Sequence, residues 1–314
     1  MKQAKPNTNC CISLLEEFTS KDFLYESEIL EFTGIGDRDV YNISHPFEIG
    51  GKTVIAGRVE KRNDWAKSNV VFFENFSSSW KVVDNAPVLK LEDAFATTLD
   101  DETILGGVEV YTENNSFNSP EIGYRTVFYR GKDLHSLKKF ACGPDRMKDI
   151  RLVPLSNGKI GVCTRPQGGE HGRGQIGSLE IHRVEEINEE NILKAKVIDK
   201  LFALDQWGGA NELHVLEDGR IGVLGHIAYE DENHYKHYYA MTFVYDPITH
   251  EASPIKILAT RKNFPAGHAK MPQLEDVVFP GGLVRHKNGY ATLYAGLSDA
   301  QAGYITLPDP FQEL

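Results

Sequence analysis

The chain has 314 residues, of which 41% are hydrophobic and 25% charged, as in ordinary globular proteins. Its formal net charge of −11 argues against a nucleic-acid partner, because phosphate backbones are bound by basic surfaces. No apolar run approaches 18 residues and the first residues lack the apolar core of a secretory signal, so we expect no membrane partner and no export. Four scattered cysteines predict reduced thiols, no metal site and a cytoplasmic location.

The predicted secondary structure is almost entirely β. Two segments, 13–18 and 185–193, have the spacing of short helices. Elsewhere short apolar runs alternate with Gly, Asn and Asp turns, as in sandwiches, barrels and propellers. Because no linker interrupts the pattern, we expect a single domain over 1–314, with 1–39 as an N-terminal segment and candidate closing strand.

One module recurs five times along the chain, over 40–60, 91–111, 147–166, 209–229 and 274–299. In each copy an acidic or amide residue opens a β-type run, a tight polar turn follows, and a second apolar run ends at polar residues. The turns read GGK, DDE, NGK, DGR and KNG, which supply the residues that tolerate positive φ in hairpins. The module openings are Asn42, Asp93, Asp149, Glu212 and Asp276.

The spacing of these openings predicts the fold. They lie 51, 56, 63 and 64 positions apart, and each interval suits a four-stranded propeller blade with its loops. We therefore predict an all-β, five-bladed β-propeller. Because the innermost strand of each blade lines the channel, the openings would place polar groups around one funnel. Carboxyls gathered there would be costly without a ligand or a partner charge, although capping of β-turns is the simpler role for any single one.

Several motifs resemble a known group of proteins. They are Leu91-Glu92-Asp93-Ala94-Phe95, Lys148-Asp149, Leu224-Gly225-His226, and, in the last module, DVVFPGG from Asp276 and LYAGLSD ending at Asp299. In order and spacing, over about 40–311, they are similar to glycoside hydrolase family 130, the five-bladed propellers that include mannoside phosphorylases. The closest likeness is to the domain-of-unknown-function family 1861.

This resemblance implies a carbohydrate-active enzyme that cleaves a β-linked glycoside, such as a mannoside, with inversion. Asp93 would be the general acid, delivering its proton through a hydroxyl of the bound sugar. Inorganic phosphate would be the co-substrate in a phosphorylase, and no other cofactor is implied. The predicted substrate-binding residues are Asn42, Arg58, Glu60, Lys148, Asp149, Asn211, Trp207 and Asp276. The chemistry agrees, because glycoside cleavage needs a protonated carboxyl and an opposed nucleophile.

The sequence departs from that group in ways that leave the nucleophile open. Ala94-Phe95 stands where the group has Pro-Arg, so an Arg associated with phosphate is missing. Arg151 and His226, together with Arg58, would rebuild a phosphate site. Glu212 would instead act as a general base for water in a hydrolase, or would simply accept a hydrogen bond from a backbone amide. A propeller that binds carbohydrate without catalysis is the alternative to both enzymes.

Two other features of the sequence concern the surroundings of the funnel. The segment 168–174, GGEHGRG, matches no nucleotide-binding pattern and is expected to be a long connection near the funnel. Trp65 and Trp207 offer aromatic faces that suit sugar rings, but core filling is the simpler role for a lone tryptophan. Trp207 is the stronger candidate because it closely precedes Asn211 and Glu212.

Overall fold

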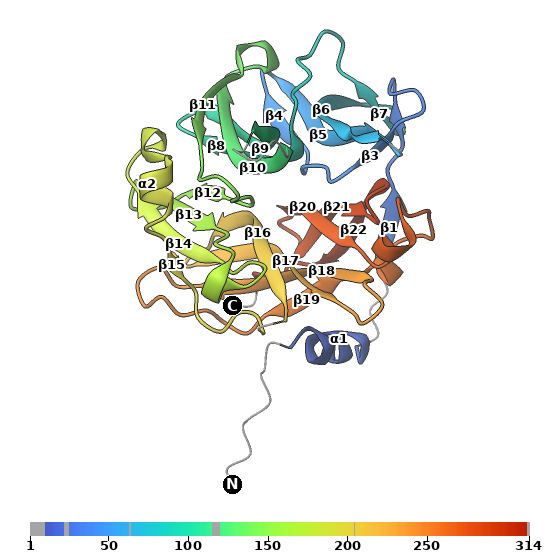
Figure 1. The fold of residues 1–314 in the computed structure, drawn as a ribbon. Coiled ribbons are helices and arrows are strands. Elements are labelled where there is room, and N and C mark those ends of the chain that lie inside the picture. The colour runs from blue at the N-terminus through green and yellow to red at the C-terminus, as the bar shows by residue number, and fades with distance from the viewer. Residues whose placement is uncertain (1–9, 22–24, 63, 115–119, 204, 313–314) are drawn as a thin grey trace.

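Five β-sheets surround a common centre in the computed structural model, which describes residues 10–21, 25–62, 64–114, 120–203 and 205–312 (Figure 1). The predicted five-bladed β-propeller is therefore confirmed. The first sheet contains β3 (Asp39–Tyr41), β4 (Phe47–Ile49), β5 (Lys52–Lys61), β6 (Asp64–Phe76), β7 (Ser79–Val82) and β2 (Phe32–Thr33). The second contains, from the centre outward, β8 (Glu92–Leu99), β9 (Glu102–Asn114), β10 (Pro120–Gly131) and β11 (Lys138–Cys142).

The remaining sheets follow in chain order. The third contains β12 (Arg151–Pro154), β13 (Ile160–Thr164), β14 (Gly177–Ile181) and β15 (Lys196–Val197). The fourth contains β16 (Trp207–Val215), β17 (Ile221–Glu230), β18 (Lys236–Tyr245) and β19 (Lys256–Ala259). The fifth contains β20 (Val278–Arg285), β21 (Tyr290–Leu297), β22 (Gln301–Pro308) and β1 (Glu26–Ile29). The N-terminal strand β1 thus pairs with the last strand, β22.

Helical structure is confined to short segments among the described residues. The two expected helices are present as α1 (Cys11–Thr19) and α2 (Glu189–Ile192), and α1 lies beside β19 in Figure 1. Five single turns of 3₁₀ helix complete the set: Leu134–Ser136, Gly169–His171, Val184–Glu186, Arg261–Asn263 and Pro272–Leu274.

Hairpin turns at the expected positions join the inner strands to their neighbours. Asp100 and Asp101 have φ of 49° and 60°, which is the left-handed pair that a type I′ turn requires. The glycines of the other turns also have positive φ, including Gly158 at 79° and Gly219 at 86°. The turn chemistry read from the sequence therefore sets the register of these hairpins.

The hydrophobic core is divided among the interfaces between neighbouring sheets. One cluster joins Phe95 of β8 to Leu152 of β12, and another joins Val40 of β3 to Ala302 of β22. Similar clusters fill the interfaces between the first and second, third and fourth, and fourth and fifth sheets. Every sheet is therefore packed on both sides, and the polar starts of the innermost strands are left to face the centre.

Candidate active site

The starts of the innermost strands have unusual backbone geometry. Asn42, Asp93 and Asp149 have φ of 43°, 50° and 62°, a left-handed conformation that non-glycine residues seldom adopt. β-Bulges interrupt the innermost strands between Glu92 and Phe95 and between Ala210 and Glu212. Such strain and bulges cluster at functional sites, where they redirect side chains.

Asp93 belongs to a buried cluster that crosses between the first two sheets. Its Oδ1 accepts hydrogen bonds from Asn42 Nδ2 at 2.8 Å and from Arg58 Nη1 at 3.3 Å. Arg58 Nη2 also donates to Glu92 Oε1 at 2.9 Å. Burial alone would lower the pKa of Arg58, but the neighbouring carboxylates outweigh it and raise that pKa. The guanidinium therefore stays charged and holds two carboxyl groups close together.

Glu60 lies behind this cluster and is only 1% exposed. It accepts a hydrogen bond from Tyr41 Oη at 2.5 Å, forms an ion pair with Lys270, and contacts Arg58 at 3.2 Å. Burial would raise its pKa, but Arg58 and the hydrogen-bond donors lower it. The sequence predicted that Glu60 binds substrate. In the structure it contacts Arg58 and helps to fix the position of that side chain.

Asp149 is the centre of a second, cationic cluster. Its carboxylate lies 3.5 Å from Arg165 Nη1 and 3.8 Å from Arg151 Nη2, and its side chain is 1% exposed. Burial would raise its pKa, but Arg165, Lys148 and other nearby cations lower it. Gly209 makes this convergence possible, since a Cβ there would lie 2.9 Å from Asp149 Oδ2.

Arg151 is fixed from several sides. Its Nε donates to the carbonyl of Asn211 at 2.7 Å and its Nη1 to that of Ile150 at 3.2 Å. The guanidinium carbon also lies 3.8 Å from the centre of the Phe95 ring. An arginine from β12 therefore stacks on the residue that stands where the resembled group has its own arginine.

Lys148 connects the two clusters electrostatically. Burial lowers its pKa, but the charges of Asp149 and Asp93 raise it overall. Its side chain is partly exposed and has no hydrogen bond or ion pair with any other described residue. An ammonium group in that setting is free to bind a ligand.

His226 is buried beside Asp149 and is neutral. Its Nδ1 lies 2.8 Å from Asn211 Oδ1, and Asn211 Nδ2 donates to the carbonyl of Pro280, so His226 Nδ1 must be the donor. Burial is the main reason that the pKa of His226 falls to about 3. A neutral His226 adds no positive charge near Asp149, and its part in a phosphate site stays a prediction.

Glu212 lies on β16, and its hydrogen-bond and ion-pair partners are outside the Asp93 cluster. His45 and His214 approach its two oxygens at 3.2 Å each, and the amide of Leu283 donates to it at 2.5 Å. Burial would raise its pKa, but the two histidines and the amide lower it to about 2. Of the two roles considered from sequence, the structure shows the hydrogen bond to a backbone amide. A carboxylate so well satisfied is a poor base.

The side chains of Asp276 and Trp207 are hydrogen-bonded to residues outside the two charged clusters. Asp276 accepts hydrogen bonds from Tyr239 Oη at 2.7 Å and lies 2.8 Å from His237 Nδ1, both on β18. Trp207 is 2% exposed, donates to Tyr238 Oη at 3.0 Å, and has Arg173 stacked 3.6 Å above its ring. Trp207 therefore fills the core in this state. The side chain of Trp65 lies outside the described part of the structure.

Three polar residues of the site were not identified from the sequence. Arg165 follows β13 and reaches Asp149, while Lys270 comes from the connection before β20 and reaches Glu60. Asp299 closes the fifth module with φ of 51°, and burial raises its pKa near Arg58 and Asp93. Its place in the LYAGLSD motif was the available signal for Asp299, and the polar close of the third module, 147–166, was the signal for Arg165. Lys270 lies at no repeated position.

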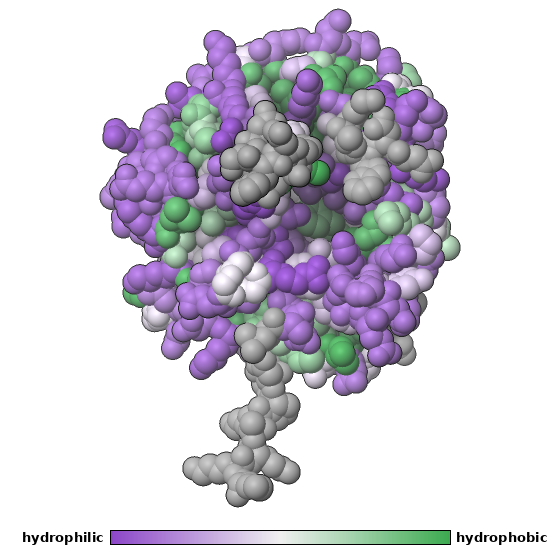
Figure 2. Space-filling view, viewed as in Figure 1, coloured by the Kyte–Doolittle hydropathy of each residue, from purple (hydrophilic) through white to green (hydrophobic). Residues whose placement is uncertain are grey.

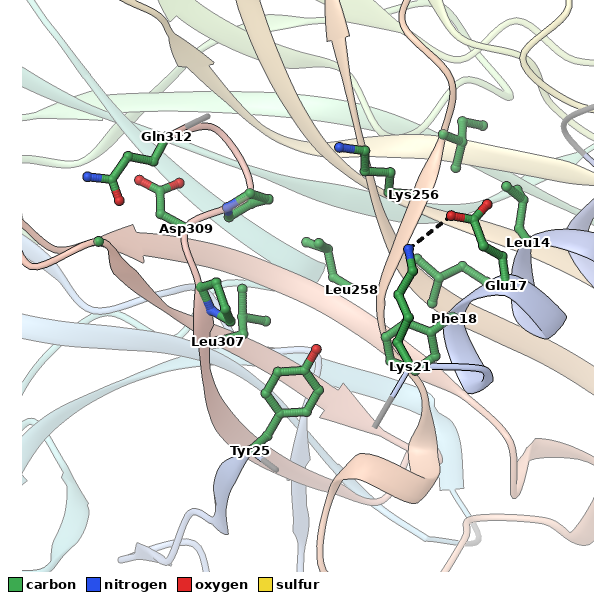
Figure 3. A pocket seen from close by; sticks show the side chains of 15 residues that line it. Leu14, Glu17, Phe18, Lys21, Tyr25, Lys256, Leu258, Leu307, Asp309 and Gln312 are labelled. Atoms are coloured by element: carbon green, nitrogen blue, oxygen red, sulfur yellow. Dashed lines mark hydrogen bonds and ion pairs between the residues drawn. The ribbon is translucent and has the colours of Figure 1, made fainter. Parts of the chain in front are cut away.

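The molecular surface agrees with a polar funnel at the centre. Figure 2 shows hydrophilic side chains around a hollow near the middle of the face. A separate cavity of about 420 Å³ lies between α1, β19 and the end of β22, where Leu258, Leu307 and Tyr25 face it (Figure 3). The described residues hold no group of three His, Cys, Asp or Glu arranged for a metal ion, and no described helix is long and apolar enough to cross a membrane.

These features define a five-bladed propeller with a funnel in which an acidic cluster faces a cationic one. The chain belongs to the family described as "Protein of unknown function (DUF1861)", which it matches over residues 16–313. A comparison with curated proteins gives no match.

Solved structures give nearer relatives. One is MPT-4, a mannose phosphorylase from Leishmania mexicana in complex with phosphate ion, which is 36% identical and has a TM-score of 0.87. The match covers 96% of this chain and 93% of that chain. MPT-1, a GDP-Man-dependent mannosyltransferase from the same organism, is 36% identical, with a TM-score of 0.86 and 96% and 95% covered. A β-1,2-mannobiose phosphorylase from Listeria innocua, at 13% identity and a TM-score of 0.59 with 92% and 93% covered, shares the fold.

Proposed function

We propose that the protein is a mannoside phosphorylase that transfers a β-linked mannosyl unit to inorganic phosphate with inversion. The observation that carries the proposal is the division of charge in the funnel. On one side, the carboxyl groups of Asp93 and Glu92 accept hydrogen bonds from Arg58. On the other side, three cations surround Asp149, namely Lys148, Arg151 and Arg165. A sugar undergoing phosphorolysis needs an acid on one side and an anion site on the other. The similarity to MPT-4, described as a mannose phosphorylase, supports the choice of sugar.

In this proposal Asp93 is the general acid. Asn42 and Arg58 each donate to its Oδ1, which leaves its second oxygen without a hydrogen bond from any described residue. That oxygen carries the proton. The family resemblance implies that the proton reaches the leaving oxygen through a hydroxyl of the bound mannose.

The phosphate in this proposal lies against Lys148. The ammonium group of Lys148 has no hydrogen bond within the described structure. In contrast, N–H groups of Arg151 and Arg165 donate to backbone carbonyls. The two arginines therefore supply fixed positive charge, and Lys148 supplies the free donors. Arg151, stacked on Phe95, compensates for the arginine that the sequence lacks at that position.

Phosphate is also the better nucleophile for this site than water. Glu212, the residue considered as a base for water, is held by His45, His214 and an amide. Phosphate needs no base of its own. The C1–O bond breaks as the new C1–O–P bond forms, the leaving oxygen takes the proton of Asp93, and the proton released from hydrogen phosphate restores it.

A second candidate is mannosyl transfer from a nucleotide-activated mannose. The observation in its favour is the similarity to MPT-1, a GDP-Man-dependent mannosyltransferase, which equals that to MPT-4 in identity. The same acidic and cationic clusters would then serve the acceptor hydroxyl and a diphosphate leaving group.

The decisive experiment compares donors and nucleophiles. The purified protein is incubated with β-1,2-mannobiose with and without phosphate, with mannose 1-phosphate plus mannose, and with GDP-mannose plus mannose. We expect mannose 1-phosphate only when phosphate is present, and β-mannobiose synthesis from mannose 1-phosphate. Free mannose released without phosphate would assign a hydrolase. Product from GDP-mannose alone would assign the transferase, and no product under any condition would favour a carbohydrate-binding propeller.

A further inference from the structure

A second cavity lies beside the glycine-rich segment 168–174. Its volume is about 710 Å³, within the range of small-molecule sites. The walls come from the connection between the second and third sheets, from the segment after β13, and from the start of β15. Its lining includes Met147, Thr164, Gln167, His171, Arg173 and Ala195.

This cavity shares its wall with the candidate active site. Met147 immediately precedes Lys148, and Thr164 immediately precedes Arg165, so the two chain segments that carry cationic site residues also line the cavity. The hydroxyl oxygen of Thr164 is buried and has no hydrogen-bond partner in the described structure. Buried polar atoms are normally satisfied, so an unpartnered one indicates a missing ligand or water.

Arg173 separates the cavity from the face of Trp207. It lines the cavity while its guanidinium lies 3.6 Å above the indole ring. Its side chain is 51% exposed and is tied to Glu230 at 3.1 Å, and exposed ion pairs of this kind contribute little. Displacing this one side chain would join the cavity to an aromatic surface.

The chemistry of the lining favours a neutral polar ligand. Arg173 is paired with Glu230, and Arg146 lies next to Asp145 in the same lining, so there is little net charge to attract a phosphate or a nucleotide. A tryptophan face with amide, imidazole and hydroxyl groups around it suits a sugar ring.

We propose that this cavity, together with the face of Trp207, binds sugar units of the substrate that lie beyond the bond to be cleaved. A sugar ring takes the place of Arg173 on the indole, and the side chains of Gln167 and His171, both partly exposed, meet its hydroxyls. This proposal rests on the proposed function and makes it more specific: the substrate is an oligosaccharide longer than a disaccharide.

The test is the dependence of kcat/KM on chain length, measured with β-linked manno-oligosaccharides of increasing length and saturating phosphate. For the wild-type protein we expect about a tenfold rise from the disaccharide to the tetrasaccharide, the value of one well-packed ring contact. Ala195→Trp fills the cavity and should abolish that rise while cleavage of the disaccharide continues. Ala86→Trp, at a half-buried alanine outside the cavity, is the matched control and should keep the rise.

Binding without turnover gives an independent measurement. In an Asp93→Asn background, addition of the tetrasaccharide should change tryptophan fluorescence, and Trp207→Phe should remove the change where Trp80→Phe does not. Arg173→Ala should lower the KM of the tetrasaccharide, because nothing then has to be displaced.

Cleavage that is equally efficient at all lengths, with no Trp207-dependent fluorescence change, would overturn the inference and leave the proposed function intact. Failure to cleave any length, with the fluorescence change preserved, would overturn the function and support the binding site.

Discussion

Two aspartates of this protein have similar backbones and opposite surroundings. Asp93 and Asp149 both open an innermost strand with left-handed φ. Asp93 shares Arg58 with a second carboxyl, whereas Asp149 faces Arg151, Arg165 and Lys148. Because nearby charge decides whether a carboxyl keeps or gives up its proton, the two residues suit different tasks. The pKa of Asp149 is lowered by its cationic neighbours, which fits a fixed carboxylate, and Asp93 is the acid in the function proposed above.

The catalytic assignment of Asp93 can be tested with Asp93→Asn. The amide keeps the oxygen that accepts from Asn42 and Arg58, so folding should be retained. The transferable proton is lost, and kcat for phosphorolysis should fall by about 10²–10⁴-fold, the usual contribution of general acid catalysis. The measurement is mannose 1-phosphate formation at saturating phosphate, with thermal unfolding as the check on folding.

Glu217→Gln is the control for this comparison, since Glu217 is an exposed carboxylate in the turn between β16 and β17. It should leave kcat unchanged. Turnover by Asp93→Asn within a few-fold of the wild type would remove Asp93 from the acid role and make Glu92 the next residue to test.

At the scale of elements, the strands could be predicted from the sequence better than the site could. Turn residues and the repeated openings are local signals, and they predicted the five sheets. They also singled out Asn42 and Asp93, which are hydrogen-bonded to each other in the structure. The partners of a side chain at a module opening come from other sheets, and the local sequence does not specify them. Glu212 and Asp276 open modules like the others, yet one is held by His45 and the other by Tyr239. Lys270 reaches Glu60 from the connection before β20, whose course depends on tertiary packing.

Two buried titratable residues on the paired strands β16 and β17, Glu212 and His226, predict how stability depends on acid pH. His226 has its pKa lowered from 6.5 to about 3, chiefly by burial, so unfolding takes up a proton between those values. The free energy of unfolding should therefore fall as the pH drops below 6.5, by up to about 1.4 kcal/mol per pH unit. Glu212, lowered from 4.5 to about 2, adds a further loss only below 4.5.

Denaturant unfolding at several pH values separates the two contributions. His226→Gln should flatten the curve between pH 6.5 and 4.5 and leave only the Glu212 contribution below 4.5. Glu212→Gln should keep the slope above 4.5 and remove the additional loss below it. An unchanged slope between pH 6.5 and 4.5 in His226→Gln would show that this histidine is protonated in the folded protein.

At the scale of the whole molecule, the propeller is closed by groups that are distant in sequence. β1 pairs with β22, so the first and last strands complete one sheet. Nearer the centre, Lys270 reaches from the segment before β20 to Glu60 and Tyr41 of the first sheet. Closure and the Asp93 cluster are therefore linked, because Glu60 also contacts Arg58, which donates to Asp93.

A disulfide across the closing strands tests whether opening of the ring limits stability. Glu26 lies directly opposite Thr306 in the antiparallel pair, and opposed positions of this kind have the separation that a disulfide needs. In Glu26→Cys/Thr306→Cys, oxidation would close a loop over most of the chain and should stabilise the fold by up to about 5–6 kcal/mol in the chain-entropy treatment. Thermal unfolding of the oxidised and reduced forms of the same protein gives the comparison, and Glu26→Cys alone controls for the four native thiols. If the cross-link forms and both forms unfold at the same temperature, unfolding begins elsewhere and β1 is not the weak point of the ring.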